Sequence, residues 1–260
     1  MKKLIVNADD FGLSCPTVEW TIKGFECGAL SSATIMAGMP ATDRAVEYAK
    51  KHPEFSFGVH LYLVDEKPMC SPEEIPSMID PRTGKLWKTR KFILRNLMGL
   101  IRVEDLKREM RAQYLAIKNA GVAISHVDGH GHNHRLPQSI KALAGLKEEL
   151  GLKKVRRCQN LSVRDCKLGL LSRAINNPMQ KRLERSGFLM TNHFLMNAGH
   201  SDDPKWFSKA LEALPDGITE IGIHPGDNEE WRRIDTEDCF EHCQQACERL
   251  SVKAINYFEI

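Results

Sequence analysis

The sequence has no apolar run of the roughly 18 residues that a membrane-spanning helix needs, so no span is expected. Its first twelve residues, MKKLIVNADDFG, contain an apolar run too short for a signal peptide, and two acids follow at once. The eight cysteines form no CxxC pair and no compact disulfide spacing. These absences favour a chain with reduced thiols in the cytoplasm over a disulfide-stabilised secreted protein.

An excess of either charge is also lacking. The 37 basic and 34 acidic residues leave a formal net charge of +3 and are scattered along the chain. This balance predicts neither a nucleic-acid-binding surface nor contact with an anionic membrane surface, although it is compatible with a small anionic ligand. No internal repeat or low-complexity tract is present.

Short β-rich runs alternate with helix-period segments along the chain. Such alternation predicts parallel strands that are joined by right-handed helical crossovers. Eight runs in 260 residues favour a single α/β domain over residues 1–260, a TIM-like parallel β/α barrel that is either closed or distorted and incompletely closed. The eight runs are Leu4–Asn7, Ser32–Ala37, Phe55–Leu63, Val122–Asp128, Lys154–Arg157, Leu189–His193, Thr219–His224 and Ile255–Ile260.

An insertion over residues 65–103 interrupts this rhythm. It holds four prolines between residues 68 and 81, followed by the basic and apolar run WKTRKFILRNLMGLIR. An insertion on a barrel rim can serve as a lid or an oligomer contact, and a surface helix with no special task is the alternative. The regular pattern then resumes with an apolar helical stripe over residues 104–120, which Gly121 ends.

Acids and imidazoles fall at the ends of the predicted strands. Asp9 and Asp10 end the first strand, His60 lies in the third, the run HVDGHGHNH follows the fourth, and His224 ends the seventh. The carboxyl ends of parallel barrel strands open at one mouth, so we expect these side chains to converge there. Convergence of this kind is what a metal site requires.

The run HVDGHGHNH covers residues 126–134. Because residues two apart share one face of an extended chain, His126, Asp128 and His130 are expected to line one side, with His132 and His134 beyond if the extension persists. Imidazoles with a carboxylate suit a divalent transition metal and leave room for water. The alternative is a solvated polar loop, which the further acids and histidines at other strand ends make less favoured.

The acidic pair in NADDFG also needs an explanation. A carboxylate buried at a barrel mouth is costly unless it is paired or binds a cation. Adjacent positions at a strand end point in different directions, so one acid can bind metal while its neighbour reaches water or substrate. The alternative is a turn that ends the strand and caps the next helix.

Four segments together resemble the YdjC-like carbohydrate deacetylases, a family that includes chitooligosaccharide deacetylase and hopanoid-associated deacetylases. They are LIVNADDFGLS, GVHLYL, HVDGHGHNH and IGIHPG, and their order and spacing match over most of the chain. The resemblance implies that Asp10, His60 and His130 bind one divalent metal ion, magnesium in some members and zinc in others. On ligand softness alone, two histidines and one carboxylate suit zinc, cobalt, iron or manganese.

The resemblance also implies roles in catalysis. Asp9 matches the catalytic base, His224 occupies the position of a general acid, and Arg156 resembles a basic residue that orients the base. Because Arg157 is adjacent, either arginine fits the last role. Family members commonly carry larger or polar residues at positions 129 and 131, where this chain has glycines, and this departure leaves the course of the loop and the roles of His132 and His134 open. The roles of His126 and Asp128 are open as well.

The expected activity is therefore metal-dependent removal of the acetyl group from an N-acetylated sugar, either a free chitooligosaccharide or a carrier-linked amino sugar. Two alternatives are another metal-dependent barrel hydrolase, such as a phosphoesterase, and a noncatalytic sugar-binding relative. The expected partner is an N-acetylated saccharide rather than nucleic acid. A homodimer, the commonest soluble assembly, remains open.

Several other residues are expected to be structural. Cys239, Cys243 and Cys247 are four apart, which could suggest a metal stripe, but they fall on an apolar helix face and are expected in the core. Most of the remaining histidines are expected to be surface or structural residues, and the tryptophans are expected to be partly buried rather than stacked on a sugar. These residues are His52, His200, His242, Trp87 and Trp231, with His193 as a weaker candidate for the pocket.

Overall fold

The computed structural model describes residues 1–163, 168–199 and 201–260. Six strands form one sheet in the spatial order β4-β3-β2-β1-β6-β5, and all of their pairings are parallel. A two-residue strand, β7, pairs with β1 outside this order. The strands are β1 (Lys2–Phe11), β2 (Ser32–Ile35), β3 (Ser56–Leu61), β4 (Ile124–Gly129), β5 (His193–Met196), β6 (Gly217–Ile223) and β7 (Lys253–Ala254).

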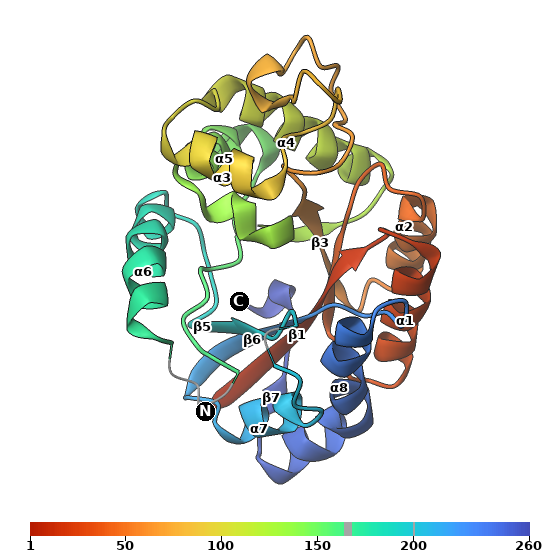
Figure 1. Ribbon diagram of the computed structural model, residues 1–260. Coiled ribbons are helices and arrows are strands. Elements are labelled where there is room, and N and C mark those ends of the chain that lie inside the picture. Colours follow the sequence, from red (N-terminus) through yellow and green to blue (C-terminus); the bar gives the residue numbers. More distant parts are fainter. Residues whose placement is uncertain (164–167, 200) are drawn as a thin grey trace.

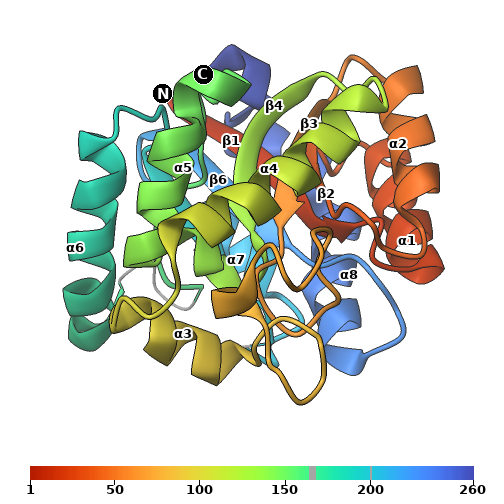
Figure 2. The same ribbon diagram turned by 90° about the horizontal axis from the view of Figure 1, so that it is seen from above.

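Helices surround the sheet as an outer layer (Figures 1 and 2). Helices α1, α2 and α8 cover one side, and α3, α4, α5 and α6 cover the other. None of the helices in the described ranges is long and apolar enough to cross a lipid bilayer. The helices are α1 (Cys15–Glu26), α2 (Thr42–Lys51), α3 (Thr89–Leu97), α4 (Val103–Asn119), α5 (Pro137–Leu150), α6 (Leu170–Arg185), α7 (Trp206–Glu212) and α8 (Glu230–Arg249), with 3-10 turns η1 (Pro76–Met78), η2 (His130–Arg135) and η3 (Tyr257–Glu259).

The sheet curls through 187°, so it forms an incompletely closed barrel, as the alternation of strands and helices predicts. Two isolated bridges, from Val155 to Val127 and from Lys154 to Leu189, partly close the gap between β4 and β5. The predicted strand at Lys154–Arg157 is therefore wrong in extent, and the one at Leu189–His193 begins only at His193. The reason is that this segment divides its pairing between two neighbours. Leu189 pairs with Lys154, whereas His193–Met196 pair with β6, so both stretches of strand pairing stay short.

The predicted eighth strand at Ile255–Ile260 is wrong. Only β7 just before it pairs with β1, and the chain then turns into η3. The Asn256 side chain accepts a hydrogen bond from the backbone N–H of Phe258, and the Glu259 side chain accepts one from that of Asn256. This capping box favours a turn over an extended strand. The turn buries Tyr257 against the barrel interior.

The barrel interior contains a chain of buried polar contacts. The Arg156 side chain is fully buried and donates from Nε to Glu220 Oε1 at 2.7 Å. Glu220 accepts a second hydrogen bond from the Tyr257 hydroxyl at 2.5 Å, and the Tyr257 ring stacks on His126 at 3.5 Å between centroids. Tyr257 also packs with Ile5 and Ile255 in a small apolar cluster.

The insertion lies on the barrel rim, because it follows directly from the carboxyl end of β3. Its backbone N–H at Ser77 donates to the Asp105 side chain of α4 at 3.0 Å. Asn96 of α3 donates to Ser139 and accepts from the backbone N–H of Gln138, which anchors the insertion to α5. The predicted helix at residues 104–120 is confirmed as α4, and Gly121 follows it at a φ of 95°.

The buried Glu220 predicts a pH-dependent loss of stability. Burial raises the pKa of Glu220 to about 7, although Arg156 and Tyr257 act in the opposite direction. Because the folded-state pKa exceeds the ordinary value of 4.5, the stabilisation is complete below pH 4.5 and is lost as the pH rises through about 7. Between pH 5 and 8, the wild type should lose roughly 2 kcal/mol of unfolding free energy relative to Glu220→Gln.

Urea unfolding of the metal-free protein at both pH values measures this difference. Glu241→Gln, which changes an exposed carboxylate of α8, is the matched control and should show no such divergence from the wild type. Parallel pH dependence of the wild type and Glu220→Gln would contradict the raised pKa.

Candidate metal and catalytic site

A bulge in β1 brings two adjacent carboxylates to the same mouth. The register of β1 against β2 shifts between Ala8 and Phe11, and Asp10 has a φ of 61°, in the left-handed region. In a regular strand Asp9 and Asp10 would face opposite sides of the sheet. A bulge re-aims one side chain relative to the next, so both acids lie buried at the carboxyl end of the sheet.

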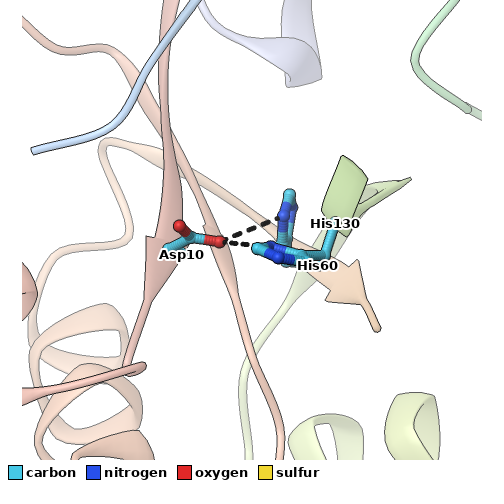
Figure 3. Close-up of side chains that lie close together, drawn as sticks. All are labelled: Asp10, His60 and His130. Atoms are coloured by element: carbon cyan, nitrogen blue, oxygen red, sulfur yellow. Dashed lines mark hydrogen bonds and ion pairs between the residues drawn. The ribbon is translucent and has the colours of Figure 1, made fainter. Parts of the chain in front are cut away.

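Asp10 meets His60 of β3 and His130, which begins η2 directly after β4 (Figure 3). Its Oδ1 atom lies 2.9 Å from His130 Nδ1 and 3.4 Å from His60 Nε2. One ligand atom from each of these three residues lies within 4.8 Å of the others, as a shared cation requires. Asp10 and His60 are buried, whereas the His130 side chain is 39% exposed and lies on the open side.

His60 is held by a carboxylate on its other side. Its Nδ1 atom lies 2.8 Å from Asp128 Oδ1, and Thr34 Oγ1 donates to Asp128 Oδ2 at 3.1 Å. Such a carboxylate orients a histidine and leaves its other nitrogen free to bind a metal. Burial lowers the pKa of His60, but the charge and hydrogen bond of Asp128, with Asp9 and Asp10, raise it to about 9.

A second cluster of possible ligands, Asp9, His60 and Asp128, overlaps the first. Its two carboxylates already bind Arg156, which lies 2.6 Å from Asp9 Oδ2 and 2.8 Å from Asp128 Oδ2. A metal ion bound by Asp9, His60 and Asp128 would have to displace this guanidinium or would be repelled by its positive charge. The donor chemistry therefore favours Asp10, His60 and His130 as the cation site.

Arg156, rather than Arg157, reaches Asp9. The guanidinium of Arg156 grips both carboxylate oxygens of Asp9, at 2.6 and 2.7 Å. Arg157 instead donates to the backbone carbonyls of Thr191 and Asn192. Burial would raise the pKa of Asp9, but Arg156 more than offsets it and holds that pKa well below its usual range.

His224 is paired with an acid that was not among the predicted site residues. Asp235 Oδ2, on α8, accepts from the backbone N–H of His224 at 2.9 Å and lies 3.1 Å from its Nδ1. Burial lowers the pKa of His224, but the hydrogen bond and charge of Asp235, with Asp9 and Asp10, raise it above its ordinary value. The half-buried Trp231 packs edge-on against His224, with 5.3 Å between ring centroids.

Arg232 is a further buried cation at the site. Its Nη2 atom donates to Asp10 Oδ2 at 2.8 Å, on the opposite side of the carboxylate from the two histidines. The residue also packs over Trp231 and donates from Nε to Glu229 at 3.2 Å. Arg232 therefore occupies Asp10 Oδ2 and leaves Oδ1 as the oxygen that faces the two histidines.

The remaining histidines of residues 126–134 do not gather at one site. His126 stacks on Tyr257 deep in the barrel, and its pKa is lowered to about 3, chiefly by burial. The extension does not persist beyond His130, because Gly131 and His132 have φ values of 57° and 56°. His132 instead lies 2.6 Å from the Met196 sulfur, and His134 lies 3.2 Å from the Arg156 carbonyl oxygen. His132 and His134 therefore do not join the three ligands.

The other residues expected to be structural lie away from the site. His193 begins β5 and contacts the Asp216 carbonyl at the opposite end of the strands, so it does not line the mouth. The three cysteines of α8 are buried in the core, as expected. His52 and His242 contact Glu54 and Asp238, Trp87 is buried beneath Lys91, and His200 lies outside the described residues.

A model of the YdjC-like protein family matches residues 3–252 of this chain. The chain belongs to this family. A carbohydrate deacetylase of Halalkalibacterium halodurans is 35% identical over 150 residues, 58% of this chain and 62% of that protein. Another, from Geobacillus stearothermophilus, is 34% identical over 153 residues, 57% of each protein. The match thus spans less than two thirds of these curated relatives.

A wider match is that to a carbohydrate deacetylase of Thermoanaerobacter pseudethanolicus, 28% identical over 228 residues, 86% of this chain and 81% of that protein. Among solved structures, a candidate cellobiose-phosphate cleavage protein of Enterococcus faecalis V583 aligns with a TM-score of 0.81 at 21% identity, over 99% of this chain and 98% of that one. A family 4 acetyl xylan esterase of Clostridium thermocellum, solved with a cobalt ion, aligns over 99% and 89% with a TM-score of 0.52 at 10% identity. These structural likenesses show the fold.

Arg232 and Asp235 were missed by sequence reasoning, yet a signal was present. They lie one turn apart on the α8 face that carries the core cysteines Cys239 and Cys243. Charged residues on a helix stripe that continues into buried cysteines are themselves expected to be buried, and buried charges need partners. Glu220 and Tyr257 carried no comparable signal, because their pairing depends on the C-terminal turn.

Replacing Asp235 tests what holds the His224 proton. In Asp235→Asn the negative charge beside the imidazolium is lost and burial remains, so the pKa of His224 should fall. NMR titration of the histidine ring nitrogens in the metal-free protein measures this pKa. Asp238→Asn, also on α8 but bonded to Ser208, is the matched control. An unchanged His224 titration in Asp235→Asn would contradict the pairing.

Proposed function

We propose that this protein is a metal-dependent hydrolase that removes the acetyl group from an N-acetylated sugar and releases acetate. One observation carries the proposal: a three-residue cation site lies beside an arginine-held carboxylate and an aspartate-held histidine at one mouth. Membership of the YdjC-like family and relatives named carbohydrate deacetylases support the same activity.

The residues at the mouth fit a divalent metal ion. Asp10 Oδ1, His60 Nε2 and a His130 nitrogen converge. Arg232 binds the other oxygen of Asp10, and Asp128 binds the other ring nitrogen of His60. Two nitrogens and one oxygen suit zinc, while magnesium favours oxygen-rich sites, and the proposal includes either ion. When bound, the ion supplies Lewis acidity that polarises a water molecule and the acetyl carbonyl.

Asp9 is the proposed general base. Its low pKa keeps it ionised at neutral pH, and Arg156 fixes its orientation through two hydrogen bonds. Oδ1 accepts from both Arg156 and Asn7, whereas Oδ2 accepts a single hydrogen bond from Arg156. Oδ2 therefore retains a lone pair that can take a proton from the attacking water.

His224 is the proposed general acid. Its Nδ1 atom is engaged by Asp235, which leaves Nε2 to carry the proton that the leaving amine requires. The raised pKa increases the fraction of His224 that is imidazolium at neutral pH. Asp9 and His224 thus hold opposite protonation states at the same pH, as one base and one acid in a single hydrolysis must.

Asp9→Asn tests the proposed base. The variant should lose turnover by about a hundredfold or more, because it removes the proton acceptor and leaves the three metal-binding residues in place. Metal binding, measured by competition with a colorimetric chelator, should stay within a few-fold of the wild type. Asp43→Asn on the surface of α2 is the matched control for both measurements. Near-normal turnover in Asp9→Asn would exclude this role.

A substrate panel tests the reaction itself. Acetate release should appear with N-acetylated saccharides, disappear on treatment with a chelator, and return when a single divalent metal is added back. The same preparations are assayed for phosphate release from a model phosphate ester. Phosphate without acetate would favour the phosphoesterase alternative, and saturable saccharide binding without either product would favour the noncatalytic one.

A further inference from the structure

Helix α3 in the rim insertion presents apolar side chains to solvent. Its buried positions, Phe92 and Asn96, are one turn apart, and Asn96 makes polar contacts with α5. The exposed apolar positions follow on the opposite face and just beyond the helix. Each of these side chains is 48–63% exposed: Leu94, Leu97, Met98 and Leu100. Clustered exposed apolar residues mark an interaction surface more often than isolated ones do.

A groove continues this apolar face between α3, α5 and α6. It has a volume of about 650 Å³, and its apolar lining comes from Leu97, Ile140 and Met179. Its rim carries the exposed basic residues Lys141, Arg182 and Arg185. Helices α3, α5 and α6 lie together on the side of the molecule away from α1 and α2 (Figures 1 and 2). The α5 end of the groove begins at Pro137, two residues after η2, which carries His130.

Basic residues outnumber acidic ones around this surface. Residues 85–103 contain six basic residues and no acidic residue, and α6 contains four basic residues and one acidic residue. Arg90 and Lys91 lie exposed one turn before Leu94 on α3. The fold thus concentrates cations that are dispersed along the sequence, which is why the near-neutral net charge did not indicate this surface.

We propose that the surface formed by α3 and the α3-α5-α6 groove docks on an anionic lipid bilayer. Apolar side chains flanked by lysine and arginine are the combination that holds a protein at a membrane interface, where the apolar residues enter the acyl boundary and the cations contact the headgroups. A second copy of the chain fits less well. A symmetric contact through the same surface would bring the basic residues of both copies together with few acids to neutralise them.

Docking through this surface places the barrel rim at the membrane, since the insertion and the start of α5 both adjoin the mouth. The inference does not depend on the reaction that the site performs. A binding measurement therefore tests it independently of turnover, and the failure of either proposal leaves the other standing.

Vesicle sedimentation of the full chain tests the proposal. The protein should sediment with vesicles of phosphatidylcholine and phosphatidylglycerol in a seven-to-three mixture, remain in solution with phosphatidylcholine alone, and be released at high salt. Arg182→Gln/Arg185→Gln should weaken the partitioning roughly tenfold or more. Leu94→Gln/Met98→Gln should weaken it as well. Lys50→Gln/Lys51→Gln, which removes two exposed lysines from α2, is the matched control and should bind as the wild type does.

Circular dichroism melts show whether each variant is folded, so this control needs no assay of the proposed reaction. No sedimentation with either vesicle, or equal sedimentation with both, would overturn the proposal. A dimer of the wild type that Leu94→Gln/Met98→Gln converts to a monomer in analytical ultracentrifugation would show that the surface is a self-interface and would overturn it too.

Discussion

The burial of Arg156 at the centre of the barrel is the constraint on which the site depends. A guanidinium with no exposed side-chain surface is tolerated only when anions and hydrogen-bond acceptors surround it. Asp9, Asp128 and Glu220 do so at 2.6–2.8 Å. Each of these acids has a second task, since Asp128 orients His60, Asp9 is the proposed base and Glu220 binds Tyr257. One cation therefore couples strands β1, β4 and β6 to the C-terminal turn.

Negative charge is in excess around this arginine, and the excess explains the direction of the pKa shifts. Asp9, Asp10 and Asp128 are buried together with Arg156 and Arg232 as the permanently charged partners. Two buried histidines, His60 and His224, consequently have raised pKa values although burial alone would lower them. The same excess of negative charge favours the binding of a metal cation. At the mouth, three converging ligand atoms are in place to hold one.

The sequence allowed the parallel β/α barrel to be predicted because alternation of strands and helices is a local property that each segment carries. It also allowed the meeting of Asp10, His60 and His130 to be predicted, because parallel strands end at a common edge. Closure of the barrel could not be predicted in the same way. Whether residues 154–157 and 189–193 form strands depends on how a curved sheet divides its pairing between two neighbours, and this is decided by tertiary geometry.

The C-terminal residues show the same limit. An apolar and aromatic run such as Ile255–Ile260 is typical of a buried strand, but only Ile255 and Tyr257 of this run are buried, and the run forms a turn instead. Tyr257 lies inside the barrel because its hydroxyl meets Glu220, and the capping pair of Asn256 and Glu259 forms the turn that brings it there. Local hydrogen bonds of this kind compete with a short strand, and here they prevail over the hydrophobic pattern.

The side chains of Asp9 and Asp10 lie on the same side of the sheet because local backbone geometry again prevails over the sequence pattern. Strict alternation would send one of two neighbouring carboxylates to the outer face of the sheet, among the helices, where a charge has no partner. The left-handed backbone at Asp10 breaks that alternation within a single residue and keeps both acids on the polar side. Such a conformation is strained for a residue other than glycine, and it persists because His60, His130 and Arg232 all contact the same carboxylate. The strain and the proposed metal site are therefore one feature: the contacts that hold Asp10 in its unusual conformation are those that place its Oδ1 atom beside His60 and His130 at the mouth.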